Sequence, residues 1–188
     1  MPIQAVWALL ALAVLAIAVL GGRWLGAWLK FRGARVITCP ENQRPAGVHV
    51  NERHAALSAL AGHPDLRLSS CSRWPQKQDC GRQCLAQIEA APEACLVRHI
   101  LAEWYQGKSC ACCGLPLGEI RWAVQKPGLI TADKTTVEWN QVPAERLPEI
   151  LENALPVCFA CHMANTLVRE HPELALDRGA LGARRFSS

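Results

Sequence analysis

The spacing of four cysteines constrains this chain more than any other feature. Two residues separate Cys110 from Cys113, and two separate Cys158 from Cys161. This spacing allows a tight turn to direct both sulfurs at one ion, and zinc takes four sulfur ligands in tetrahedral geometry. We therefore expect these four cysteines to form one zinc site, which requires the segment between them to fold back. Cys112 is surplus, and either substitutes for a neighbour or stays a free thiol.

The N-terminal half carries a second, irregular set of cysteines. Cys80 and Cys84 are four residues apart in a predicted helix that continues through residue 88, so they would share one helical face. They could bind a second metal together with Cys71 and either Cys39 or Cys95, either as zinc or as an iron-sulfur cluster, which also uses four thiolates. Cys39, Cys71, Cys80 and Cys84 form the quartet we predict.

The first 22 residues are almost entirely apolar, and a helix of this length spans a bilayer core of about 30 Å. A secretory signal peptide opens with a basic region, whereas the first basic residue here is Arg23, which favours an uncleaved anchor. Residues 1–33 are therefore predicted to be a transmembrane anchor with a basic interfacial flank. Because that flank is positive, we expect a single-pass protein of the inner (plasma) membrane with its soluble domain in the cytoplasm.

The flank also accounts for the formal net charge of +4, since it contributes Arg23, Lys30, Arg32 and Arg35 and no acidic residue precedes Glu41. The rest of the chain is formally neutral, so a nucleic-acid partner is not expected. In an exported domain the ten cysteines could instead form disulfides. A reducing cytoplasm keeps thiols free and favours metal binding.

Hydrophobic periodicity and turn residues predict an α+β fold: the N-terminal transmembrane helix is followed by a small cysteine-rich, metal-stabilised domain. The predicted regions are a cysteine-rich α+β region over 34–107, a zinc-binding region over 108–172 and a flexible tail over 173–188. The predicted strands cover 36–38, 47–50, 66–68, 119–124 and 135–139, and the predicted helices start near Asn51, Pro92, Leu147 and His162.

A cysteine knuckle, a hairpin and a helix carrying the second cysteine pair follow one another over residues 110–171. This order resembles a treble-clef zinc finger. Within treble clefs, the segment from Leu155 to Asn165 resembles the second zinc knuckle and helix of HNH-type nucleases. That resemblance implies a catalytic histidine on the hairpin, but the chain has no histidine between His99 and His162. Nuclease activity is therefore not expected.

Two other chemistries use the same cysteine spacing. Cys158, Cys161 and His162 match the attachment motif of c-type cytochromes, which would make the chain a membrane-tethered electron carrier with covalent haem. Haem attachment takes place outside the cytoplasm and leaves Cys110 and Cys113 unexplained. The cysteine pairs also match thiol-disulfide redox motifs, but no surrounding βαβ pattern is evident.

The motifs Cys39-Pro-Glu-Asn, Cys71-Ser-Arg-Trp-Pro and Arg169-Glu-His-Pro-Glu-Leu, with the Cys158 motif, are similar to those of an uncharacterised family of bacterial membrane-anchored cysteine-rich proteins. That resemblance implies no activity. No glycine-rich phosphate loop, nucleophile elbow or paired-carboxylate motif stands out, so no small-molecule substrate is evident. We expect a non-enzymatic interaction or assembly module at the membrane, with another protein as its partner.

Overall fold

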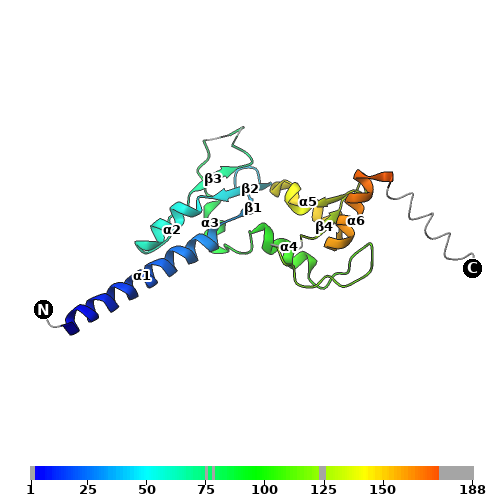
Figure 1. Cartoon of the computed structure of the whole chain (residues 1–188). Coiled ribbons are helices and arrows are strands. Elements are labelled where there is room, and N and C mark those ends of the chain that lie inside the picture. The colour runs from blue at the N-terminus through cyan, green and yellow to red at the C-terminus, as the bar shows by residue number, and fades with distance from the viewer. Residues whose placement is uncertain (1–2, 75, 78, 123–125, 174–188) are drawn as a thin grey trace, which may run out of the picture. The chain divides into compact units, whose positions relative to one another are not determined.

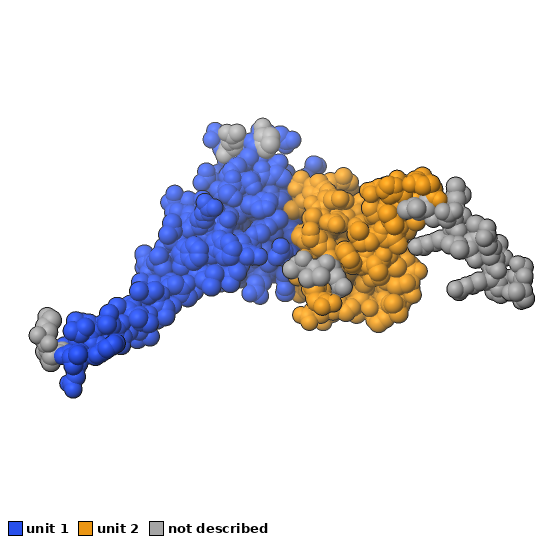
Figure 2. Space-filling model, in the orientation of Figure 1, with its two compact units in different colours: residues 1–100 blue, residues 101–188 orange. Residues whose placement is uncertain are grey.

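A computed structural model describes residues 3–74, 76–77, 79–122 and 126–173. The chain forms two compact units, residues 1–100 and residues 101–188 (Figure 2). Both combine short helices with a three-stranded sheet, as expected for an α+β fold. The predicted tail, apart from residue 173, lies outside the described residues.

Unit 1 begins with one long helix, α1 (Ile3–Phe31), whose N-terminal turns stand clear of the rest of the unit (Figure 1). It is long and apolar enough to cross a membrane, judged by length and composition alone. The helix continues nine residues beyond the predicted end at Gly22. The Arg23 guanidinium donates to the Gly62 carbonyl at 2.8 Å, and Phe31 lies in the hydrophobic core. These contacts override the low helix propensity of Gly21, Gly22 and Gly26.

Arg35 is fully buried directly after α1 and closes the C-terminal end of that helix. Its two terminal nitrogens donate to the carbonyls of Phe31 and Lys30, each at 2.6 Å, and one also reaches Gly33 at 3.2 Å. The last carbonyls of a helix have no partner within the helix, and a cation there also complements the helix dipole. Three carbonyls therefore accept from the two terminal nitrogens of this buried cation, whereas its Nε has no hydrogen-bond partner among the described residues.

A three-stranded antiparallel sheet in the order β1-β2-β3 organises the rest of unit 1. The Asn51 side chain caps α2 by accepting from the His54 amide at 3.0 Å, as its position predicts. The core includes Ile37, Val48, Leu68 and Ile88. The elements after α1 are β1 (Ala34–Thr38), β2 (Pro45–Val50), α2 (Glu52–Leu60), β3 (Leu68–Cys71) and α3 (Leu85–Ala90).

Two predictions for this unit need correction. The strand expected at 66–68 begins at Leu68 and runs to Cys71. The prediction that Cys80 and Cys84 share a helical face is wrong, because α3 begins only after Cys84. Arg82 has a positive φ of 51°, which is incompatible with a right-handed helix through the two cysteines.

Helix α4 (Val97–Tyr105) spans the point at which the two units divide and confirms a helix in this region, but it begins five residues after the predicted start at Pro92. Unit 2 contains an antiparallel sheet in the order β5-β4-β6, and α6 packs on β4 and β5. Its elements are β4 (Gly128–Ile130), β5 (Thr136–Glu138), short 3-10 turns at Trp139–Gln141 and Ala144–Arg146, α5 (Leu147–Asn153), β6 (Leu155–Val157) and α6 (Phe159–Glu170).

The strand predicted over 119–124 is wrong where the structure describes it. Residues 119–122 have no strand structure, whereas Ala123 and Val124 lie outside the described residues. The partner of β5 is instead β4, with Leu129 opposite Val137. The apolar residues at 120, 122 and 124 give the alternation of a strand, whereas the three residues of β4 are too few to show any period.

Gly128 of β4 is close to a residue of α4 and to a residue of α6. The Tyr105 hydroxyl donates to its carbonyl at 2.7 Å. On its other side, a Cβ atom at residue 128 would lie 2.8 Å from Cγ and Nδ1 of His162. A residue with a side chain would therefore displace the imidazole.

We predict that Gly128→Ala destabilises unit 2 by about 1–3 kcal/mol, because overpacking a closely filled site costs that much. The measurement is the unfolding transition of the full-length protein. Gly118→Ala is the matched control, since a Cβ at that position meets nothing within 4 Å. Equal stability of both variants would show that His162 moves aside without cost.

Candidate metal centre

The first cysteine pair lies in a tight knuckle after α4. The Cys110 amide donates to the Leu115 carbonyl and the Gly114 amide donates to the Cys110 carbonyl, both at 2.8 Å. Gly114 has a positive φ of 74°, which glycine adopts without strain. The Ala111 amide donates to the Pro156 carbonyl at 2.8 Å. This last bond fixes the knuckle to β6, the strand that leads into the second pair.

The second pair lies at the start of α6. Cys158 is the N-cap residue, and its sulfur accepts from the Cys161 amide at 3.5 Å. Because β6 ends at Val157, one residue turns the chain from strand into helix and points both sulfurs toward the knuckle. Free amides at a helix N-terminus also favour negative charge, as a bound thiolate requires.

The two pairs converge in space. The sulfurs of Cys110, Cys113, Cys158 and Cys161 all lie within 4.8 Å of one another, so this group could hold a metal ion. The sulfurs of Cys113 and Cys158 are 3.9 Å apart, and the Cys158 amide donates to the Cys110 sulfur at 3.3 Å. Four sulfurs this close match the donor set of a tetrahedral Cys₄ ion such as zinc.

Burial and hydrogen bonds within the cluster shift the pKa values of its thiols in different directions. Burial opposes ionisation of Cys110, but the amides of Cys158, Cys113 and Cys112 outweigh it and lower its pKa to about 6. The pKa of Cys158 is raised, chiefly by burial. The pKa of Cys161 is raised mainly by its hydrogen bond with the Cys158 thiol. A cation supplies the opposite charge that lets all four sulfurs ionise together, and its binding releases the protons.

Cys112 and His162 are next to cluster residues in the sequence, but their surroundings differ. Cys112 is exposed and outside the group of four, and its sulfur accepts from the Asn165 side chain at 3.6 Å. His162, the proposed haem ligand, is only 5% exposed and packs on Gly128. Its Nδ1 has no hydrogen-bond partner among the described residues. No sequence pattern indicated the Gly128 contact, which depends on the pairing of β4 with β6.

The predicted second quartet lies in unit 1. Cys39, Cys71, Cys80 and Cys84 line one pocket, although they come from four different segments. The alternative ligand Cys95 is absent from that pocket's lining, and its thiol donates to the Ala91 carbonyl at 3.4 Å. The structure therefore groups Cys39, rather than Cys95, with the other three.

Comparison of the chain with known protein families, with curated proteins and with solved structures finds no match. The arrangement of the cysteines in the two units is accordingly the basis for any functional argument.

We predict that Cys110→Ser or Cys161→Ser abolishes metal binding in unit 2 and leaves that unit open to protease. Binding of structural zinc by four thiolates contributes about 10–16 kcal/mol of folding free energy, which exceeds the stability of most small domains. Cys112→Ser, a matched exchange outside the cluster, should keep both metal and protease resistance. Full resistance and metal content in Cys110→Ser and Cys161→Ser would contradict a four-thiolate site.

Proposed function

We propose that the chain is a membrane-anchored zinc protein whose C-terminal unit acts as a non-enzymatic interaction or assembly module. The observation that carries this proposal is the convergence of four thiols within 4.8 Å in unit 2. The sheet of that unit has only three residues in each strand. A bound ion would therefore stabilise a fold whose own core is small.

The order of elements supports a treble-clef-like zinc centre. The knuckle at Cys110–Gly114 is followed by the hairpin β4-β5, and the second cysteine pair opens α6. Cys110, Cys113, Cys158 and Cys161 would hold the ion, and with all four sulfurs bound there is no open coordination position. A closed Cys₄ site is typical of structural zinc and supplies no activated water.

An exposed apolar stripe on α6 supports a protein partner. Met163 and Leu167 lie one helical turn apart, and each is 47% exposed. Val168 and Leu155 of the same unit are also exposed. Neighbouring exposed apolar side chains such as Met163 and Leu167 are typical of a protein-binding surface.

Helix α1 supports attachment to a membrane. Large apolar side chains along its N-terminal turns are exposed, including Leu9, Leu15 and Ile17. Trp24 and Trp28 stack with their ring centroids 6.3 Å apart, and the Arg32 guanidinium lies over the Trp28 ring at 4.9 Å. Aromatic and basic side chains directly after an apolar stretch favour the headgroup layer on the cytoplasmic side.

Metal identity separates this proposal from electron transfer. Zinc is d¹⁰ and redox-inactive, so unit 2 should hold about one equivalent of colourless metal that Cys110→Ser removes. Elemental analysis and a visible spectrum of the full chain, purified anaerobically from membranes, test this. Covalent haem on Cys158 and Cys161, or iron lost with Cys110→Ser, would replace the zinc module with an electron carrier.

Labelling of the exposed Cys112 thiol can show on which side of the membrane unit 2 lies. We expect a membrane-impermeant maleimide to label Cys112 in opened membrane vesicles but not in intact cells, because the proposed domain lies in the cytoplasm. Cys112→Ser provides the background, and resistance of the protein to alkaline extraction checks that it is integral. Equal labelling of Cys112 in intact cells would place the domain outside.

A further inference from the structure

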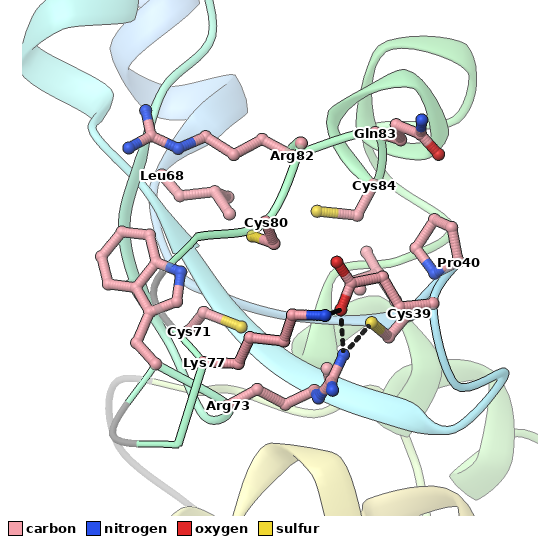
Figure 3. A pocket seen from close by; sticks show the side chains of 15 residues that line it. Cys39, Pro40, Leu68, Cys71, Arg73, Lys77, Cys80, Arg82, Gln83 and Cys84 are labelled. Atoms are coloured by element: carbon pink, nitrogen blue, oxygen red, sulfur yellow. Dashed lines mark hydrogen bonds and ion pairs between the residues drawn. The ribbon is translucent and has the colours of Figure 1, made fainter.

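The pocket in unit 1 brings together four cysteines that are up to 45 residues apart in the sequence. Cys39 follows β1, Cys71 ends β3, Cys80 lies in the loop before α3, and Cys84 is the N-cap of α3. Figure 3 shows the side chains of these four cysteines around the same pocket. We propose that Cys39, Cys71, Cys80 and Cys84 bind a second metal centre, either zinc or an iron-sulfur cluster. This proposal is independent of the function proposed for unit 2.

The surroundings of Cys39 are those of a metal-binding thiolate. The Arg73 guanidinium donates to the Cys39 sulfur at 2.7 Å. The Cys39 amide donates to the Arg44 carbonyl at 2.9 Å and the Gln43 amide donates to the Cys39 carbonyl at 2.8 Å, which is the pattern that the Cys110 and Gly114 amides form in unit 2. Gln43 also has a positive φ of 56°, as Gly114 does at the same place in its turn. The turn after Cys39 thus repeats the local arrangement of the knuckle in unit 2.

The four cysteines of the pocket are all at least partly shielded from solvent. Cys39 and Cys84 are buried, and Cys71 and Cys80 are of intermediate exposure. A cation bound between them would offset the charge of several ionised thiols in this partly enclosed space.

Basic side chains around the pocket match the charge that such a centre would carry. Four thiolates around one dication leave a net charge of −2. Arg73 and Lys77 line the pocket and also pair with Glu41, at 3.2 and 3.1 Å. Arg82, also in the lining, lies over the Trp74 ring at 5.9 Å. These cations would offset the negative charge of a thiolate-bound metal centre in the pocket.

The spacing of the sulfurs is compatible with two kinds of centre that thiolates bind, a zinc ion and an iron-sulfur cluster. Among the residues that the structure describes, only the four cysteines of unit 2 have ligand atoms that all lie within 4.8 Å. The sulfurs around the unit 1 pocket are therefore further apart. One zinc ion would draw them inward, with the Arg73 side chain moving off Cys39. An iron-sulfur cluster contains several metal atoms and bridges more widely spaced thiolates.

The test is metal content and visible absorption of the full chain purified without oxygen, compared with two double variants. Wild type should hold two metal centres. Cys110→Ser/Cys161→Ser should keep the unit 1 centre, and Cys80→Ser/Cys84→Ser should keep only the unit 2 centre. If both are zinc, each double variant loses half of the bound metal; if unit 1 holds a cluster, Cys80→Ser/Cys84→Ser loses all iron and colour but no zinc.

Cys95→Ser is the control, because Cys95 belongs to unit 1 but does not line the pocket. It should retain both centres. Cys80→His tests whether metal is lost through misfolding and not through loss of a ligand. If Cys80 is a ligand, histidine can replace it, so the protein keeps its metal and the charge-transfer spectrum of the cobalt-substituted protein shifts. One metal per wild-type chain, lost entirely with Cys110→Ser/Cys161→Ser, would overturn the second centre and leave the unit 2 proposal intact. Metal unchanged by Cys110→Ser/Cys161→Ser would count against unit 2 alone.

Discussion

The convergence of four thiols is the constraint on which unit 2 depends. The sulfurs of Cys110, Cys113, Cys158 and Cys161 lie within 4.8 Å of one another, so a cation between them would favour ionisation of all four. Hydrogen bonds within the cluster lower the pKa of Cys110 and raise the pKa of Cys161. Hydrogen bonds of the surrounding backbone hold the two cysteine pairs together. The Ala111–Pro156 hydrogen bond fixes the knuckle to β6, and the Cys158 amide points at the Cys110 sulfur.

A second set of contacts connects the cysteine cluster to the rest of unit 2. His162 follows Cys161 directly, and its imidazole occupies the space that a side chain at Gly128 would need. The carbonyl of Gly128 accepts from Tyr105 in α4. At the far end of α6, Arg169 donates to the Thr136 carbonyl of β5 at 3.3 Å. The helix that carries two sulfurs is thus held to the sheet at both ends, which limits how far the cluster can open.

Local signals in the sequence predicted the elements that depend on local physics. The Asn51 cap, strand β1 and the apolar face of α4 follow from short-range patterns, and the two-residue cysteine spacing predicted the unit 2 group. The predictions that failed depend on strand pairing, on one backbone conformation and on a pocket formed by distant segments. Strand β4 has only three residues and exists because β5 and β6 flank it. The break before α3 depends on the backbone of Arg82, and sequence spacing alone could not choose between Cys39 and Cys95.

Helix α1 runs without a break from its apolar turns to Phe31 in the core of unit 1. The nine residues from Arg23 to Phe31 rise about 12 Å, and Arg35 closes the end of the helix, so no flexible linker follows it. If the apolar turns lie in a bilayer, unit 1 stays at a fixed height and turns with its helix. Encounters with a membrane-bound partner would then be a search in two dimensions, at a higher effective concentration than free diffusion allows.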